Sequence, residues 1–310
     1  MDFHQLRIFM EVARQKSYTR AAENLFLSQP TVSIHIKKLE EELEVPLFKR
    51  VKAGFELTEA GKVLFHYGQE LLATKAEALS AIEKGSGTVK GHLQIAASSV
   101  PGAYLLPGLL RDFCRLHPQV TFSLLQRDTG QVLESIRDYT CDLGFIGEPG
   151  PRSQLEQIKL AEDELILVAA PCLAAEIPSA EKAEGELPGV LLNDCLDLPF
   201  LLREPGSSTR QVFEDALKDQ AASNENLRVI GYLESQEAII EAVKAGLGLT
   251  VISARAVRDE LETGLLKGYR IKDFSLKRHF YLVFRKESVL SPLSRAFFEF
   301  VRGELIGPAE

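Results

Sequence analysis

The spacing of apolar residues near the N-terminus most restricts the fold, because it fits three short helices joined by tight turns. Over residues 3–13 apolar side chains recur at three- and four-residue steps, which is the pattern of an amphipathic helix. A break at 15–17 precedes a second short helix. Ser28 and Pro30 are then suited to begin a third, since Ser is a favoured N-cap and Pro a favoured first-turn residue. The sequence therefore predicts a helix-turn-helix core.

The third predicted helix, SQPTVSIHIKKLEEELE, has one apolar face and one face that suits DNA. At about 100° per residue, four apolar residues fall in one narrow sector that we expect to be buried: Val32, Ile36, Leu39 and Leu43. The opposite side carries short hydroxyls, an apolar side chain and two lysines, a set that matches base edges, a thymine methyl group and phosphates in a major groove. A solvated face is the alternative, and Ile34 opposite the core argues against it.

After Pro46, the segments LFKRV and FELT predict a small β-hairpin, or wing, with Arg50 available for a phosphate. Thr58 then caps a long helix in which Leu64, Leu71 and Ala78 recur at heptad spacing. A long helix with a single apolar seam needs a partner. The simplest partner is the same helix of a second chain, and packing against the chain's own C-terminal domain is the alternative.

A Gly-Ser-Gly run at 85–87 ends this helix, and from residue 91 strands alternate with helices. Repeated βα units predict a largely parallel α/β sheet. Two long segments cross between two lobes that enclose a cleft. We expect the first lobe at about 91–161 and 268–304 and the second at about 162–267.

Composition excludes several classes of protein. The 310 residues are 45% hydrophobic and 26% charged, and no apolar run approaches the length of a membrane helix. The first residues, MDFHQLR, are too polar for a signal peptide, so we expect a cytoplasmic protein. The four cysteines lie more than twenty residues apart without a CxxC, which disfavours zinc and redox sites. The net charge of −8 does not describe residues 1–60, where nine basic residues match nine acidic ones.

An enzyme is disfavoured as well. The six histidines are scattered, and no GxSxG, GxxxxGK[ST] or HExxH motif is present. AGLGLT lies between a predicted helix and a predicted strand, which is opposite to the order of a Rossmann loop. We therefore expect no catalytic residues, no metal and no cofactor.

Residues 1–60 closely resemble the winged helix-turn-helix of LysR-type transcriptional regulators, through SQPTVS, HIKKLEEEL, PLFKR and LTEAG. The rest of the chain fits the same family, including DLGF and AGLGLTVIS. The resemblance implies an all-α winged helix-turn-helix at 1–58, a linker helix for dimerisation at 59–88, and an α/β two-lobe effector domain like that of periplasmic binding proteins at 89–310. It also implies a homodimer, and usually a homotetramer, that binds double-stranded promoter DNA, with RNA polymerase as a candidate further partner.

The resemblance assigns DNA contacts residue by residue. Base contacts fall on Gln29, Pro30, Thr31, Ser33 and Ile34, and backbone contacts on Ser17, Thr19, Lys37, Lys38 and Arg50. Many relatives carry a long polar or cationic residue where Ile34 stands. Contact with a thymine methyl group is therefore expected there rather than guanine reading.

Three strand-to-helix joints at the carboxyl ends of strands form the candidate effector site. Their hydroxyls and the backbone N–H groups at the helix starts can bind an anion. Ser and Thr are also the commonest helix caps, so a single joint of this kind is not evidence for a ligand. The convergence of three joints favours a ligand. The candidates are Ser98, Ser99, Val100, Thr129, Ser207, Ser208, Thr209 and, more weakly, Gln236. The sulfur-assimilation branch of the family binds small inorganic anions with hydroxyls that match Ser98 and Ser208. We thus expect an inorganic oxyanion or small carboxylate that modulates DNA binding or bending.

Overall fold

The computed structural model describes residues 1–51, 54–82, 89–138, 140–151, 155–178, 187–219, 227–273, 275–286 and 290–306. The chain forms two compact units, which we describe separately: Met1–Lys90 with Glu287–Phe297, and Gly91–Lys286 with Phe298–Glu310. None of the described helices combines the length and the apolar character that crossing a membrane requires.

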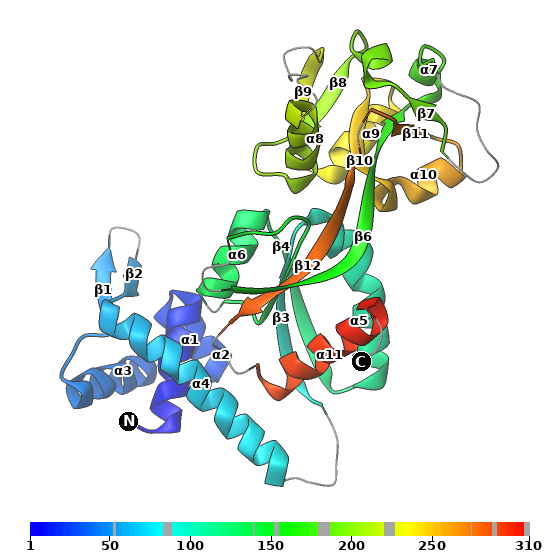
Figure 1. Cartoon of the computed structure of the whole chain (residues 1–310). Helices are drawn as coiled ribbons and strands as arrows, with labels where there is room; N and C mark the ends of the chain where they lie inside the picture. The colour runs from blue at the N-terminus through cyan, green and yellow to red at the C-terminus, as the bar shows by residue number, and fades with distance from the viewer. Residues whose placement is uncertain are drawn as a thin grey trace. The chain divides into compact units, whose positions relative to one another are not determined.

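Three helices build the core of the first unit, as the sequence predicts (Figure 1). They are α1 (Phe3–Gln15), α2 (Tyr18–Leu25) and α3 (Gln29–Leu43). Each begins with a side-chain cap, because Asp2, Ser17 and Ser28 each accept a hydrogen bond from the backbone N–H three residues further on.

The buried stripe of α3 is shorter than predicted. Val32, Ile36 and Leu39 are fully buried against α1 and α2, whereas Leu43 is 36% exposed. Leu43 is the last residue of the helix, and Glu44 after it turns into the left-handed conformation, so the chain leaves the core there.

The predicted wing is an antiparallel hairpin of β1 (Phe48–Val51) and β2 (Gly54–Leu57), in which Phe48 lies opposite Leu57. Its turn at Lys52 and Ala53 lies outside the described residues. Tyr18 of α2 packs edge-on against Phe55 with a centroid distance of 5.0 Å, which fixes the hairpin on the helices.

The long helix α4 (Glu59–Ile82) starts where the sequence predicts, with Thr58 accepting a hydrogen bond from the Gly61 N–H at 3.0 Å. It packs closely on α1 at Gly68, where an added Cβ would lie 2.8 Å from Leu6. Apolar side chains on its described part remain exposed in the single chain: Val63, Tyr67, Leu71 and Leu79.

The second unit contains an eight-stranded sheet in the order β4-β3-β5-β12-β6-β11-β7, with β10 paired to β6. Its strands are β3 (Gly91–Ala97), β4 (Val120–Gln126), β5 (Leu143–Ile146), β6 (Leu155–Ala169), β7 (Gly189–Val190), β10 (Thr250–Ser253), β11 (Lys267–Ile271) and β12 (Lys277–Arg285). A separate parallel pair is formed by β8 (Phe200–Arg203) and β9 (Val229–Leu233).

The prediction of a largely parallel sheet is wrong, because the sheet is mixed. β3 runs parallel to β4 and β5, but β12 is antiparallel to both β5 and β6, and β10 and β11 are antiparallel to β6. The two long strands β6 and β12 run side by side through both lobes (Figure 1), and their opposite directions give the sheet its mixed character.

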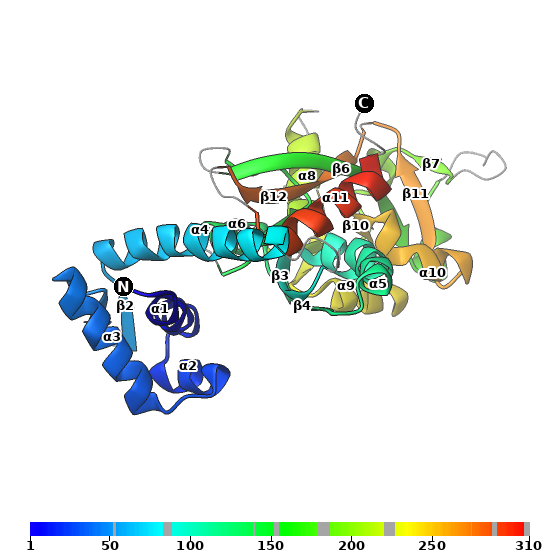
Figure 2. The ribbon, with the colours of Figure 1, turned by 90° about the horizontal axis from the view of Figure 1, so that it is seen from below.

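Helices cover the sheet on both sides. They are the π-helical turn η1 (Pro101–Leu105), α5 (Leu106–Leu116), α6 (Thr129–Arg137), α7 (Pro171–Ala174), η2 (Leu192–Cys195), α8 (Ser208–Asp219), α9 (Gln236–Lys244), η4 (Ala254–Val257), α10 (Arg258–Glu262) and α11 (Pro292–Ile306). α5 and α11 lie side by side (Figure 2), with the rings of Phe113 and Phe300 5.4 Å apart.

Successive side chains of β6 point to opposite faces of the sheet, and both faces contribute to the core of the second lobe. Leu165 and Leu167 point into the cluster that holds Phe213 of α8, and Ile166 and Val168 point into the cluster that holds Ile239 of α9. The strand is therefore buried on both faces, with α8 and α9 on opposite sides.

We propose the domain boundaries predicted above with one change. β11 pairs with residues 167–169 of β6 and with β7, which are strands of the predicted second lobe. The second lobe then continues to the start of β12 at Lys277.

Candidate functional site

The residues predicted to read DNA bases lie on the outer side of α3. Gln29, Pro30, Ser33 and Ile34 are exposed, and Ile34 is 54% exposed although it is apolar. Thr31 is only half-exposed, because its hydroxyl shares a 2.7 Å hydrogen bond with Ser28 in the cap of the helix. The N-terminal end of this face thus combines an amide, short hydroxyl side chains and the apolar Ile34.

The residues predicted to contact phosphates surround this face. Lys37 and Lys38 are exposed on α3, and Arg50 is exposed on the wing. Lys37 lies 3.6 Å from Glu41, and an exposed pair of this kind contributes little, so the ammonium group remains available to a phosphate. Thr19 is exposed in the first turn of α2, and the hydroxyl of Ser17 caps that helix.

In the second unit, the three strand-to-helix joints meet at one pocket of about 420 Å³. It is lined by several of the predicted residues, namely Ser98, Ser99, Thr129, Ser207 and Ser208. Val100, Thr209 and Gln236 are buried and do not line it. The last two lie behind the lining, where Thr209 accepts a hydrogen bond from Arg278 and Gln236 accepts one from Arg203.

Four buried polar atoms at this place have no hydrogen-bond partner among the described residues. They are Ser98 Oγ and Thr129 Oγ1, which line the pocket from the first lobe, Gln236 Nε2 in the second lobe, and Arg278 Nη2 on the crossover strand β12. Buried polar groups are nearly always hydrogen-bonded, so each orphan needs an explanation. All four can donate a hydrogen bond, and for Ser98 and Thr129, which line the pocket, a ligand rich in acceptor oxygens is the simplest partner.

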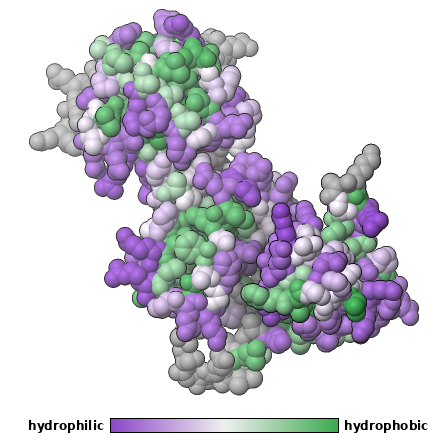
Figure 3. Space-filling view, turned by 180° about the vertical axis from the view of Figure 1, so that it is seen from behind, coloured by the Kyte–Doolittle hydropathy of each residue, from purple (hydrophilic) through white to green (hydrophobic). Residues whose placement is uncertain are grey.

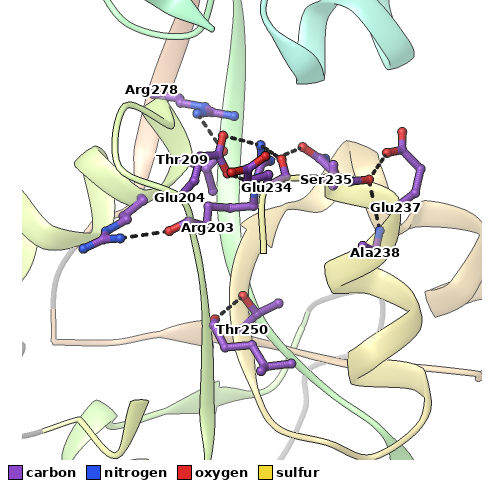
Figure 4. A network of polar contacts seen from close by, with 12 residues as sticks. Arg203, Glu204, Thr209, Glu234, Ser235, Glu237, Ala238, Thr250 and Arg278 are labelled. Carbon is purple, nitrogen blue, oxygen red and sulfur yellow. Dashed lines mark hydrogen bonds and ion pairs between the residues drawn. The ribbon is translucent and has the colours of Figure 1, made fainter. Parts of the chain in front are cut away.

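Arg203 on β8 holds the second-lobe side of the pocket in place (Figure 4). Its guanidinium is buried, donates to both carboxylate oxygens of Glu204, and donates to the Glu234 carbonyl at 2.8 Å and to Gln236 Oε1 at 3.1 Å. Arg210 donates to the Arg203 carbonyl and pairs with Glu214 at 2.7 Å. These residues form a charge-balanced frame for the loop between β8 and α8.

Arg278 on β12 is a further residue at the site and is not among the predicted ones. Its Nη1 donates to Ser208 Oγ at 3.1 Å and to Thr209 Oγ1 at 3.2 Å, while its Nε pairs with Asp163 at 2.9 Å. Burial lowers the pKa of the Arg278 guanidinium, and Asp163 beside it opposes this shift, so the group stays a cation at neutral pH. The signal in the sequence is a charged residue at the start of the strand segment RHFYLVFR.

Neither buried cysteine of the second unit, Cys141 or Cys195, lines the pocket. Burial raises the pKa of Cys141 and of Cys195 to about 11, so both are protonated thiols at neutral pH. Within the described ranges, no group of three or more His, Cys, Asp or Glu side chains is arranged to hold a metal ion.

A helix-turn-helix with a wing, joined to a two-lobe domain with a polar pocket, defines a DNA-binding regulator with a sensory domain. The family model for bacterial regulatory helix-turn-helix proteins of the lysR family matches residues 3–62, and the model for the LysR substrate binding domain matches residues 86–306. The chain therefore belongs to the LysR family of transcriptional regulators. This confirms the predicted family, fold class and function as a regulator rather than an enzyme.

Individual relatives agree with this assignment. The RuBisCO operon transcriptional regulator of Allochromatium vinosum is 34% identical over 304 residues, which cover 98% of this chain and 96% of the relative. A full-length OxyR variant from Pseudomonas aeruginosa is similar in structure, with a TM-score of 0.72 and 23% identity over 97% of this chain and 95% of that one. The CcmR regulatory domain of Synechocystis in complex with 2-PG aligns with a TM-score of 0.59 and 23% identity over 69% of this chain and 97% of that one.

Proposed function

We propose that this regulator senses a small anion with phosphate or carboxylate groups in the pocket between its two lobes. The observation that carries the proposal is the pair of orphaned donors Ser98 Oγ and Thr129 Oγ1, which line one polar pocket together with Ser207 and Ser208 of the second lobe. Helix N-termini add to it, because α6 and α8 both begin at the pocket and their dipoles favour negative charge. An apolar or aromatic ligand would leave these donors unpaired at a cost of about 1–3 kcal/mol each.

2-Phosphoglycolate is the first candidate. Many of the curated relatives are described as RuBisCO regulators, and the CcmR domain is described as a complex with 2-PG. The molecule carries two ionised groups on a short chain, which suits a small pocket with donors on both walls. Inorganic phosphate and sulfate are the second candidates, as the resemblance to the sulfur-assimilation branch suggests.

Isothermal titration calorimetry of the full-length protein at constant ionic strength tests this proposal. The probes are 2-phosphoglycolate, inorganic phosphate, sulfate and glycolate, which lacks the phosphate. We expect saturable binding of at least one of the first three and a loss of at least tenfold in affinity in Ser98→Ala. Ser135→Ala is the matched control, because Ser135 lies on α6 outside the pocket lining. Binding of none of these probes by the folded protein would contradict the proposal.

We propose that DNA is bound by the outer face of α3, the start of α2 and the wing. Ile34 supports this part, since its apolar side chain is exposed on the face that the resemblance assigns to DNA bases. A thymine methyl group is an apolar partner in the major groove, and Lys37, Lys38 and Arg50 then reach phosphates on either side.

We propose that two chains associate through α4. The exposed residues Val63, Tyr67 and Leu71 on this helix support it, because apolar side chains at four-residue steps lie along one side of the helix and form a seam for a second helix. The first lobe offers a further apolar surface, where Leu116, Phe122 and Leu125 of α5 and β4 are exposed, and Figure 3 shows apolar groups gathered on one face of this lobe. A tetramer that uses both surfaces is the assembly we propose.

Effector binding in the pocket then changes the angle between paired subunits, and this changes the spacing of their DNA-binding heads. The altered spacing changes the access of RNA polymerase to the promoter in the cytoplasm. Small-angle scattering of the DNA complex with and without a saturating anion tests this step. An unchanged scattering profile would contradict it.

A further inference from the structure

A buried ion pair joins the two long crossover strands directly behind the pocket. Asp163 of β6 and Arg278 of β12 lie opposite each other in the strand register, 2.9 Å apart, with side chains 0% and 1% exposed. Ser253 donates a 2.7 Å hydrogen bond to the second oxygen of Asp163. Taking two charges out of water is costly unless the geometry is well satisfied, so a pair in this position calls for a specific reason.

The Arg278 guanidinium reaches from this pair to the first residues of α8 (Figure 4). It donates to the hydroxyl oxygens of Ser208 and Thr209, and a guanidinium has donors only. Both hydroxyl oxygens are therefore acceptors toward Arg278, and each hydroxyl hydrogen is left to point elsewhere. Ser208 lines the pocket and Thr209 does not, so the hydrogen of Ser208 is the one that a ligand can use.

The backbone of the first lobe lies on the other side of the Ser208 hydroxyl. A Cβ on Gly147, just after β5, would lie 2.7 Å from Ser208 Oγ and 3.3 Å from Arg278 Nη1. The backbone at Gly147 thus lies against Ser208, and the cation lies behind it. The second terminal nitrogen of Arg278 is buried and has no partner among the described residues.

We propose that Arg278 is a positioning residue for effector specificity, which fixes the Ser208 hydroxyl as a hydrogen-bond donor toward the pocket and so favours ligand oxygens that accept, above all ionised ones. This inference rests on the proposed effector site and adds a reason for its specificity. A ligand group that has donors only, such as an ammonium group, meets a second donor at this place and is rejected. A neutral hydroxyl oxygen can accept the hydrogen bond but binds more weakly than an ionised oxygen.

A double-mutant cycle with 2-phosphoglycolate, or with whichever of phosphate and sulfate the wild type binds, tests the role of Arg278. Arg278→Met is combined with Asp163→Asn so that neither partner of the buried ion pair is left as an unpaired charge. We expect this paired variant and Ser208→Ala each to raise the Kd at least tenfold, and Ser208→Ala to add less than twofold when introduced into the paired variant. Arg278→Lys, which keeps a cation and a donor, is expected to bind more tightly than the methionine variant.

The outcomes separate the two proposals. If the wild type binds none of the anions, the effector proposal itself fails. If the wild type binds and the increases in Kd caused by the paired variant and by Ser208→Ala multiply, Arg278 has a structural role and the inference is overturned. The same holds if the paired variant keeps the wild-type Kd and loses only thermal stability. If the paired variant does not fold, Arg278→Lys replaces it in the cycle, because it keeps a cation beside Asp163 while removing the guanidinium that holds Ser208.

Discussion

A single methyl group at Gly147 tests the geometry behind the pocket. The backbone of Gly147 is not in the left-handed region, so alanine fits its conformation, but the Cβ would stand 2.7 Å from Ser208 Oγ. Real Cβ contacts stay above 3.0 Å, so the two groups must separate by at least about 0.3 Å. The second contact, 3.3 Å to Arg278, leaves little room for that movement because Arg278 is held by Asp163.

Overpacking of this kind costs about 1–3 kcal/mol. For a domain of this size, roughly 2–4 °C of melting temperature is lost per kcal/mol, so Gly147→Ala is expected to melt about 2–12 °C below the wild type. The displaced hydroxyl also weakens anion binding by about tenfold, or about 1.4 kcal/mol. Differential scanning fluorimetry and calorimetric titration with 2-phosphoglycolate, phosphate and sulfate measure the two effects.

Gly108→Ala is the matched control. Gly108 lies in α5 with nothing within 4 Å of an added Cβ, so alanine there is expected to stabilise the helix by up to about 1 kcal/mol and to leave anion binding unchanged. A Gly147→Ala protein that melts and binds like the wild type would refute the close approach of the two lobes at Ser208.

Three further predictions concern the first unit. Lys37→Ala is expected to weaken the binding of all DNA sequences about equally and to reduce the slope of log K against log salt by about 0.9 per subunit. Ile34→Ala is expected to change the sequence preference at constant slope. Fluorescence anisotropy measures both, and equal effects of the two variants would contradict the face assignment. Burial raises the pKa of Tyr18 to about 12, above the unfolded value near 10, so the folded state holds its proton longer and stability falls as pH rises between about 10 and 12. In Tyr18→Phe, the free energy of unfolding in urea is expected to fall less between pH 9 and pH 11 than in the wild type. An equal fall in both proteins would contradict this role of Tyr18. Leu71→Asp is expected to lower the mass measured by light scattering, and a wild-type mass would exclude α4 from the interface.

Local features of the fold are predictable from the sequence because they depend on neighbouring residues. The Ser28 and Thr58 caps, the hairpin after Pro46 and the strand-to-helix joints all follow from patterns within a few residues. Leu43 shows the limit of this reasoning, since helical periodicity places it with the core but does not show where the chain turns away.

Features that depend on distant pairing are not predictable in this way. The direction of β12 against β6 arises from contacts between residues more than a hundred positions apart, so alternating strands and helices suggest a parallel sheet where a mixed one forms. The pairing of Arg278 with Asp163 has the same origin. Thr209 and Gln236 are next to the pocket rather than in its lining, because a helix start alone does not determine which side chains face the cavity.

The central claim is that a small anion in the pocket changes how this regulator binds DNA. The most direct test is footprinting on DNA fragments selected by the purified full-length protein, with and without the anion that calorimetry identifies, in the wild type and in Ser98→Ala. We predict that the anion changes the length or the position of the protected region in the wild type and that Ser98→Ala needs at least tenfold more anion for the same change. Identical footprints at a saturating concentration of a bound anion would contradict the account.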